Sequence, residues 1–184
     1  MFIDYKLEGI HTNLRSVKED DAEKILKLRN DPRITDFLPP LDVTVEQQRQ
    51  WITKQRSDKS SYYFIIEDKL GNCLGTVGFY DIEGDHAETG RYCCIGEVQH
   101  SVEATILQSD FIYDVVRLSY LTSWVYDDNK PVVSLTKNYG FECVGVSQAD
   151  DGRSCCLFKQ TREQYFKKRE KIVTNFLFLL IIIT

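Results

Sequence analysis

The chain has 184 residues, with 23 Lys and Arg against 28 Asp and Glu, and a formal net charge of -5. This length suits one domain with at most a small appendage, and 42% hydrophobic residues suffice for a core. The acidic balance excludes a nucleic-acid-binding protein, because phosphate backbones are held by clustered Lys and Arg. Ten Gly and four Pro exclude a collagen-like or low-complexity chain.

Two capping boxes predict two helices after a first strand. The box at Ser16 to Glu19 precedes apolar residues at helical spacing, which predicts a helix over 19–30 that ends at Asp31-Pro32. The box at Thr44 to Gln47 predicts a second helix that carries Trp51.

The spacing then changes to that of strands, which are expected over 62–67, 73–80 and 88–95 as a meander. A helix over 102–116, a strand over 121–126 and a short helix over 130–139 capped by Asn129 follow. Two closing strands, over 141–146 and 155–159, precede a helix over 161–171. This order predicts an α+β (mixed α/β) protein built on one mixed sheet.

Six cysteines are expected to be free, buried thiols. Cys93-Cys94 and Cys155-Cys156 are not expected to bond within each pair, because neighbours on a strand point to opposite faces. No C-x-x-C is present and the three His lack metal-ligand spacing, so no metal site is predicted. Without the apolar core of a signal peptide at the first residues, a cytoplasmic location is expected.

Three segments together resemble a known family. In the first segment, Asp128 to Phe141, an Asn caps a helix that ends in Gly-Phe directly before a strand. The second is Leu28 to Pro32, which is followed by Pro39-Pro40 and the helix that carries Trp51. The third is Ala87 to Tyr92. Over roughly residues 14–159 the chain resembles the GNAT superfamily of acetyl-CoA-dependent N-acetyltransferases. The similarity is to the subset with ribosomal-protein N-terminal, polyamine and nucleotide-amino-sugar acetyltransferases.

The resemblance implies a GNAT-like fold, with a central twisted, mostly antiparallel mixed sheet flanked by helices. It implies one acetyltransferase domain over 1–160 and a C-terminal helix and apolar extension over 161–184. It also implies acetyl-CoA as cosubstrate, whose pyrophosphate is held by backbone N–H groups at a helix N-terminus. The family loop Gln/Arg-x-x-Gly-x-Gly/Ala corresponds to Gln99 to Ala104, with Val102 at the first Gly.

Ser101 is expected to donate its hydroxyl where Val102 obstructs the close approach that Gly allows. The full set of residues expected to bind the cofactor is Ile95, Gly96, Gln99, Ser101, Val102, Ala104 and Asn129. For Asn129, a role as helix cap without any ligand stays open.

An acceptor amine is mostly protonated at neutral pH, so a base must remove a proton before it attacks the thioester. The resemblance suggests Glu88 as this base and Glu97 as second candidate, while a merely solvated Glu88 stays open. A backbone N–H near Ile95-Gly96 would stabilise the oxyanion. Where many members have a Tyr acid this chain has Thr136, so Tyr139, about one helical turn on, is the candidate acid. Departure of the thiolate without an acid also stays open.

Arg29 and Asn30 lie where the resemblance puts the acceptor. The predicted function is transfer of an acetyl group from acetyl-CoA to a primary amine of a small molecule, an amino sugar or a protein N-terminus. Because Val102 and Thr136 depart from the family pattern, a catalytically silent CoA-binding or interaction module remains the alternative.

The eight apolar residues Phe176 to Ile183 are too few to span a bilayer, which takes about 20 residues. They are expected to pack against the domain or a second subunit, which would make a homodimer. Shallow insertion into a membrane beside Lys167 to Lys171 stays open.

Overall fold

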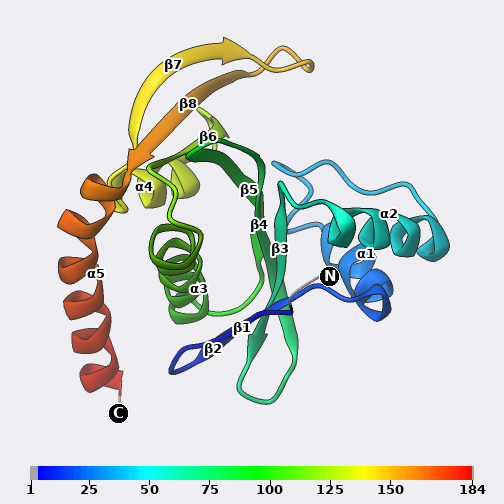
Figure 1. The fold of residues 1–184 in the computed structure, drawn as a ribbon, viewed down its shortest axis with the longest axis horizontal. Coiled ribbons are helices and arrows are strands. Elements are labelled where there is room, and N and C mark those ends of the chain that lie inside the picture. Colours follow the sequence, from blue (N-terminus) through cyan, green and yellow to red (C-terminus); the bar gives the residue numbers. More distant parts are fainter. Residues whose placement is uncertain (1–3, 184) are drawn as a thin grey trace. The chain divides into compact units, whose positions relative to one another are not determined.

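The computed structural model describes residues 4–183, with side chains to Asn175. The chain folds into two compact units, one of Met1–Ile82 with Thr89–Gln108 and one of Glu83–Glu88 with Ser109–Thr184. Each unit is described by itself, with the element labels of Figure 1. Strand β5 (His86–Cys94) contributes residues to both units.

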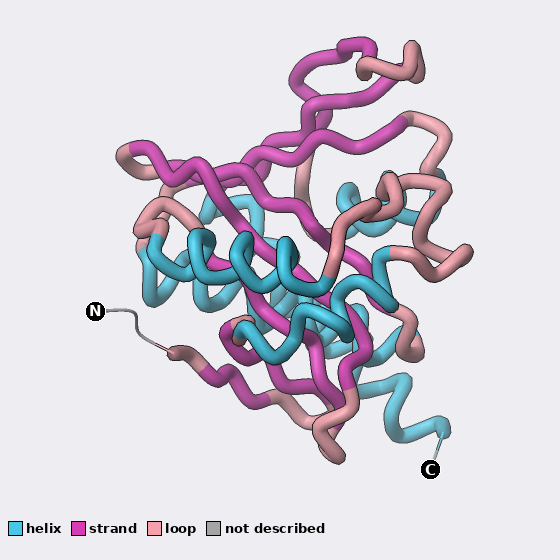
Figure 2. Tube along the Cα trace, turned by 90° about the vertical axis from the view of Figure 1, so that its right-hand side faces the viewer, coloured by secondary structure: helices cyan, strands magenta, loops and turns pink. Residues whose placement is uncertain are grey.

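The first unit is built on antiparallel strands covered by helices. Strands β1 (Lys6–Glu8), β2 (Thr12–Ser16), β3 (Tyr62–Asp68), β4 (Cys73–Glu83) and the later part of β5 are hydrogen-bonded in that order. Helices α1 (Ala22–Arg29) and α2 (Val45–Ser57) lie on one face of these strands, with α3 (Val98–Asp110) on the other (Figure 1). Figure 2 shows α1 and α2 in front of the strands.

The core of this unit joins α1 and α2 to the strands. Ile25 of α1, Ile52 of α2 and Ile65 of β3 are buried together in one cluster, each at most 1% exposed. The apolar residues that recur at helical spacing are therefore those that face the sheet, which explains why these segments form helices here.

The second unit holds β6 (Tyr120–Tyr126), α4 (Lys130–Asn138), β7 (Glu142–Gln148), β8 (Ser154–Thr161) and α5 (Arg162–Ile183). The first residues of β5 pair in parallel with β6, and the order continues through β8 to β7 by antiparallel pairing. Leu121, Val125, Cys156 and Phe158 are buried on one face of β6 and β8.

The predicted mixed, mostly antiparallel architecture is confirmed, while some element bounds are corrected. Ser16 does not cap a helix: it lies in β2 and its Oγ accepts the Tyr5 N–H at 3.0 Å. A 3-10 turn over Glu19–Asp21 leads into α1, and the Asp21 carboxylate accepts the Lys18 N–H at 2.8 Å. The sequence predicted a single strand before the first helix, whereas the structure has a hairpin of two strands, β1 and β2.

Helix α3 begins at Val98, four residues before the predicted start, and continues as a π-helix over Phe111–Val116 that ends at Arg117 (φ 66°). The capping box at Thr44 is confirmed, because its side chain accepts the Gln47 N–H and the Gln47 side chain accepts the Thr44 N–H.

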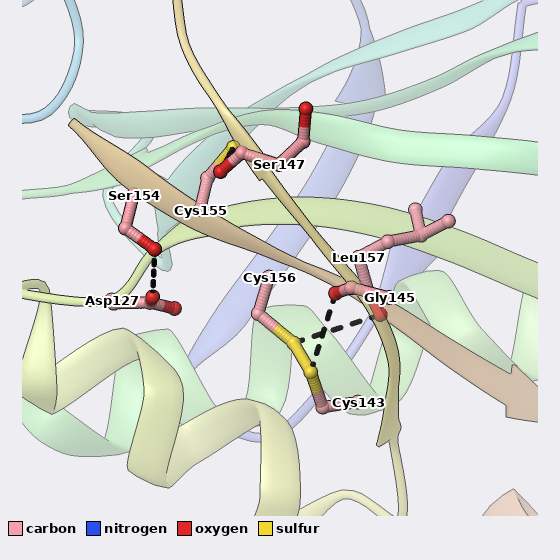
Figure 3. The surroundings of a disulfide bond; sticks show 8 residues. All are labelled: Asp127, Cys143, Gly145, Ser147, Ser154, Cys155, Cys156 and Leu157. Atoms are coloured by element: carbon pink, nitrogen blue, oxygen red, sulfur yellow. Dashed lines mark hydrogen bonds between the residues drawn. A yellow bond between two sulfur atoms is a disulfide. The ribbon is translucent and has the colours of Figure 1, made fainter. Parts of the chain in front are cut away.

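Cys143 and Cys156 form a disulfide between β7 and β8, with Cα atoms 6.0 Å apart (Figure 3). The expectation of six free, buried thiols is therefore wrong for this pair, and Cys143 is exposed. Neither adjacent pair bonds internally, as predicted. The free thiols are those of Cys73, Cys93, Cys94 and Cys155.

Helix α5 extends well past the predicted end at 171. The expected packing of Phe176 to Ile183 concerns side chains that lie outside the described residues. Within the described part of the chain, no helix combines the length and apolar character needed to cross a membrane.

Candidate active site

The predicted site residues fall in both units. The first unit contains Arg29 and Asn30 at the end of α1, and the segment 95–104 from the end of β5 into α3. The second contains Glu88, Asn129 and Tyr139. The two sets are built on different elements and are taken in turn.

The start of α3 carries the predicted cofactor segment. The carbonyl of Glu97 accepts the N–H groups of His100 (3.0 Å) and Ser101 (3.3 Å), so the helical ladder begins at Glu97. The Nδ1 of His100 in turn accepts the Glu97 N–H at 3.1 Å, which makes His100 a helix cap. The first N–H groups of a helix have no acceptor within it and attract anions. Val98 and Gln99 supply these N–H groups, which fits a pyrophosphate.

Four predicted cofactor residues, Gln99, Ser101, Val102 and Ala104, are inside α3 and not in a loop. The Ser101 hydroxyl is hydrogen-bonded to the Tyr92 hydroxyl of β5, where burial raises the pKa of the Tyr92 phenol. Ala104 is fully buried, and Val102 is half-buried. The Gln99 amide donates to the Glu97 carboxylate. At this end of α3 a ligand would therefore bind mainly to the backbone N–H groups of the first turn and less to these side chains.

The end of β5 shows that one of the two predicted oxyanion donors is occupied. The Ile95 N–H donates to the Leu74 carbonyl of β4 at 2.8 Å, so it is already used. Successive residues of an antiparallel strand point their N–H groups to opposite edges, so Cys94 directs its N–H away from β4. At Gly96 a β-carbon would lie 3.0 Å from Leu74 Cδ1 and 3.1 Å from His100 Nδ1, which explains the glycine.

Arg29 and Asn30 hold the segment between α1 and α2. The Asn30 amide accepts the Leu41 N–H at 2.9 Å and donates to the Leu41 carbonyl at 3.1 Å. Arg29 Nη2 donates to the Pro39 carbonyl at 2.8 Å. Among the described residues, the buried Nε–H of Arg29 has no hydrogen-bond partner. Since buried donors in native proteins are normally bonded, this group marks a place for a ligand acceptor.

A second arginine near the same place was missed from the sequence. Arg91 has a left-handed backbone (φ 52°), and its guanidinium lies 4.3 Å from the ring centre of Tyr80 and 5.1 Å from that of Trp51. Burial raises the pKa of Tyr63 to about 12, although Arg29 and Arg91 act in the opposite direction. Arg91 Cζ also lies 5.7 Å from the ring centre of Tyr63. No motif in the sequence indicated this cluster.

In the second unit, Glu88 lies at a strand position with defined neighbours. It is half-buried and pairs with Thr122 of β6, which in turn pairs with Lys159 of β8. Residues in register across a sheet share a face, so the Glu88 carboxylate and the Lys159 ammonium lie on the same face. The parallel register of β5 with β6 covers only His86 to Glu88.

Asn129 and Tyr139 mark the two ends of α4. The predicted cap is confirmed, since Asn129 Oδ1 accepts the Val132 N–H at 3.3 Å, which leaves its amide N–H groups for other partners. The Tyr139 side chain is only 3% exposed, and its carbonyl accepts Gln160 Nε2 at 2.6 Å. This burial argues against Tyr139 as a proton donor and favours departure of the thiolate without an acid.

Within the described residues, no group of three or more His, Cys, Asp or Glu side chains is arranged to hold a metal ion.

Several known proteins are similar to this chain in sequence or in fold. The acetyltransferase PseH of Campylobacter jejuni (strain 81-176) is 23% identical over 133 residues, which cover 70% of this chain and 82% of the relative. The solved structure of apo FdhC, described as a nucleotide-linked sugar GNAT, has a TM-score of 0.79 at 21% identity and covers 93% of this chain and 98% of that one.

The spermidine N-acetyltransferase of Vibrio cholerae, solved with CoA and spermine, has a TM-score of 0.76 at 17% identity, covering 85% of this chain and 98% of that one. The profile of the Acetyltransferase (GNAT) domain matches residues 11–142, a span that includes parts of both units. The chain belongs to the GNAT acetyltransferase family.

Proposed function

We propose that this chain transfers an acetyl group from acetyl-CoA to the primary amine of a nucleotide-linked amino sugar. The observation that carries the choice of acceptor is the buried, unpartnered Nε–H of Arg29. It favours an acceptor with anionic or carbonyl oxygens. Arg91 lies 5.7 Å from the Tyr63 ring centre in the same unit, and a polyamine, which is a polycation, would be repelled by these arginines and would need converging carboxylates instead.

The likeness to FdhC, described as a nucleotide-linked sugar GNAT, supports the same acceptor class. The family profile spans both units, which supports the further proposal that residues 1–160 act as one catalytic domain.

The roles of the chain's own groups follow from their positions. Acetyl-CoA, when bound, supplies a thioester carbonyl that is activated towards amines. We assign the N–H groups of Val98 and Gln99 to the pyrophosphate, and the Cys94 N–H to the oxygen that gains negative charge. Glu88 accepts one proton of the acceptor ammonium, and the freed amine nitrogen bonds to the carbonyl carbon. The nitrogen then releases its second proton to water as the C–S bond breaks. The CoA thiolate leaves and takes a proton from solvent.

The first experiment is a CoA-release assay with three acceptors: a nucleotide-linked amino sugar, spermidine and a peptide with a free N-terminus. The expected result is the highest kcat/KM on the amino sugar. Higher kcat/KM on spermidine or the peptide contradicts the acceptor class. Binding of acetyl-CoA without release of CoA from any acceptor would instead support a silent module, which Val102 and Thr136 favour.

A second experiment tests the base. Glu88→Gln is expected to lower kcat by about 10²- to 10⁴-fold, because the ammonium loses its proton acceptor. The Kd for acetyl-CoA should not change. Glu83→Gln, an exposed acid at the end of β4, is the matched control and should retain full activity. Full activity of the Glu88 variant contradicts its assignment.

A further inference from the structure

Strand β6 has one buried face and one aromatic face. Leu121 and Val125 are buried, at 2% and 8% exposure, and they alternate with Tyr120, Thr122, Trp124 and Tyr126, which are half-buried or exposed. Because side chains alternate along a strand, these four share the opposite face. On β8, Figure 3 shows Cys155 and Leu157 on the face away from the disulfide, and these residues pair with Tyr126 and Trp124.

Cations already cover the outer two tyrosines of this aromatic face. Lys159 Nζ lies 3.8 Å from the ring centre of Tyr120, and the His86 ring stacks on Tyr120 at 4.9 Å. Arg153 Cζ lies 3.8 Å from the ring centre of Tyr126, and this arginine is paired with Asp151 at 2.8 Å.

Trp124 lies between the two tyrosines and is 45% exposed. Among the residues with described side chains, no ring or cation is stacked on its indole, and no carboxylate lies within ion-pair distance of Lys159. The aromatic face thus offers one open π surface at Trp124, and Lys159, whose register partner Thr122 is two residues before Trp124, holds an ammonium group on the same face over Tyr120. An aromatic base stacks on such a surface, and a phosphate pairs with such a cation.

The position of Glu88 connects this surface to the proposed chemistry. Glu88 pairs with Thr122, and Trp124 is two residues further along the same strand on the same face. Strand geometry places their Cα atoms about 8 Å apart, from a spacing of about 4.8 Å between strands and about 6.7 Å for two residues. A ligand whose amine reaches Glu88 is long enough to place a second ring over Trp124 if it is a nucleotide-linked sugar.

We propose that Trp124 and Lys159 bind the nucleotide part of the acceptor, with the base stacked on the indole and the phosphates paired with the ammonium group. This inference rests on the acceptor class proposed above, and it assigns the residues that determine specificity for that class. Trp124 and Lys159 are specificity-determining residues in this scheme, while Glu88 acts on the amine.

The test measures binding without turnover. Uridine, cytidine and guanosine diphosphates are titrated into the full chain by calorimetry, with CoA at saturation so that its own adenine diphosphate site is filled. Trp124→Ala is expected to weaken binding of the preferred diphosphate by about 5- to 150-fold, the range for one stacked base. Trp124→Phe should restore most of it, and Lys159→Gln should weaken the diphosphate more than the nucleoside.

Lys137→Gln, which replaces an exposed lysine of α4, is the matched control and should bind as the parent does. Because Trp124 is exposed, its variants are expected to fold, and the unchanged Kd for CoA verifies this. Absence of diphosphate binding by the parent chain, or equal binding by Trp124→Ala, overturns the inference. The inference is also overturned if Trp124→Ala changes the mass of the protein in sedimentation and leaves diphosphate binding unchanged, since the surface is then a subunit interface.

The two proposals fail in different ways. Trp124-dependent diphosphate binding with no CoA release from an amino sugar contradicts the proposed function alone. Acetylation of a nucleotide-linked amino sugar with a KM that does not respond to Trp124→Ala contradicts this inference alone.

Discussion

Glu103 shows how one side chain organises the start of the chain. It is 6% exposed and accepts backbone N–H groups from Ile10 (2.5 Å), His11 (2.8 Å) and Thr12 (2.6 Å). A β-carbon at Gly9 would overlap the Glu103 carboxyl group, so glycine is required there. The partners are more than 90 residues apart in sequence, which is why local patterns did not predict the β1–β2 hairpin.

Replacing Glu103 with Ala is expected to lower the free energy of unfolding by about 2–4 kcal/mol, because three N–H groups lose their acceptor in a partly buried place. Urea denaturation measures this. Glu23→Ala removes an exposed carboxylate of α1 and should change the free energy by less than about 0.5 kcal/mol. Equal effects of the two substitutions would show that the Glu103 bonds contribute nothing specific.

At the scale of elements, Arg15 joins β2 to β3 and to the turn before α1. Its Nη1 and Nη2 bind the two Asp21 oxygens at 2.6 and 2.7 Å, and its Nε binds Glu67 at 2.5 Å. Burial acts to raise the pKa of Asp21, but the hydrogen bonds from Arg15 and Lys18 outweigh it and hold the pKa below the ordinary value of 3.8. The ionised carboxylate is thus the form that the fold favours.

The stability from Asp21 is therefore fully present above pH 3.8 and is lost as the pH falls through the lowered, folded-state pKa. Asp21→Asn is expected to lower the free energy of unfolding by about 2–3 kcal/mol at pH 7. This is less than the cost of breaking a fully buried ion pair, because Arg15 keeps its ion pair with Glu67 and some contact with solvent. The difference between parent and variant should shrink in strong acid. Denaturation curves between pH 2 and pH 7, roughly the span of carboxyl titration, measure it. A constant difference over this range contradicts the titration of Asp21.

The disulfide belongs to the β7–β8 pair, where β7 pairs with no strand other than β8 among the described residues. Titration of thiols in denaturant should find four in the oxidised protein, since four of the six cysteines are free. Cys143→Ser should lower the unfolding free energy by about 2–3 kcal/mol under oxidising conditions, from the loss of a short closed loop. Six reactive thiols in protein purified without reductant would contradict the disulfide. A reducing cytoplasm, which the sequence predicts, would favour that result. Cys73→Ser, which removes a free thiol, is the control.

The success of sequence prediction differed between elements for physical reasons. Helices α2 and α4 were found because their caps, Thr44 and Asn129, are local signals whose side chains bond within three residues. The start of α3 was missed because its cap is a histidine, His100, which is not a usual capping residue. That the Ile95 N–H is already used could not be predicted, since it depends on a pairing with Leu74 that the sequence does not state.

At the scale of the whole molecule, the family was predicted because the order of elements and the Asn129 segment survive as local patterns. The aromatic face and the place of Arg91 were not predicted, since these residues meet their neighbours only through strand register, whereas Arg29 was already expected at the acceptor site. What remains a prediction is the fate of the apolar C-terminal residues, which we expect to be covered by the domain or a second subunit.

A chain truncated after Lys171 tests this expectation. It retains Tyr165 and Arg169, which bind the Asp110 carboxylate at 2.8 and 2.6 Å, so the base of α5 should stay in place. Loss of the covered apolar segment is expected either to lower the melting temperature or to convert a dimer to a monomer, as scanning calorimetry and sedimentation would report. Unchanged values for both contradict the expectation, and flotation of the full chain with liposomes would then place the segment at a membrane surface.

Strand β5 has a consequence for the order in which the protein is made. Its first residues belong to the second unit and its later ones to the first, so neither unit is a continuous stretch of chain. On the ribosome the first unit lacks its last strand and α3 until Gln108 has emerged, and Glu83–Glu88 must wait for β6. All residues of the first unit are therefore available once Gln108 has emerged, whereas Glu83–Glu88 stay without their partner strand until β6 is made, so the second unit matures after the first.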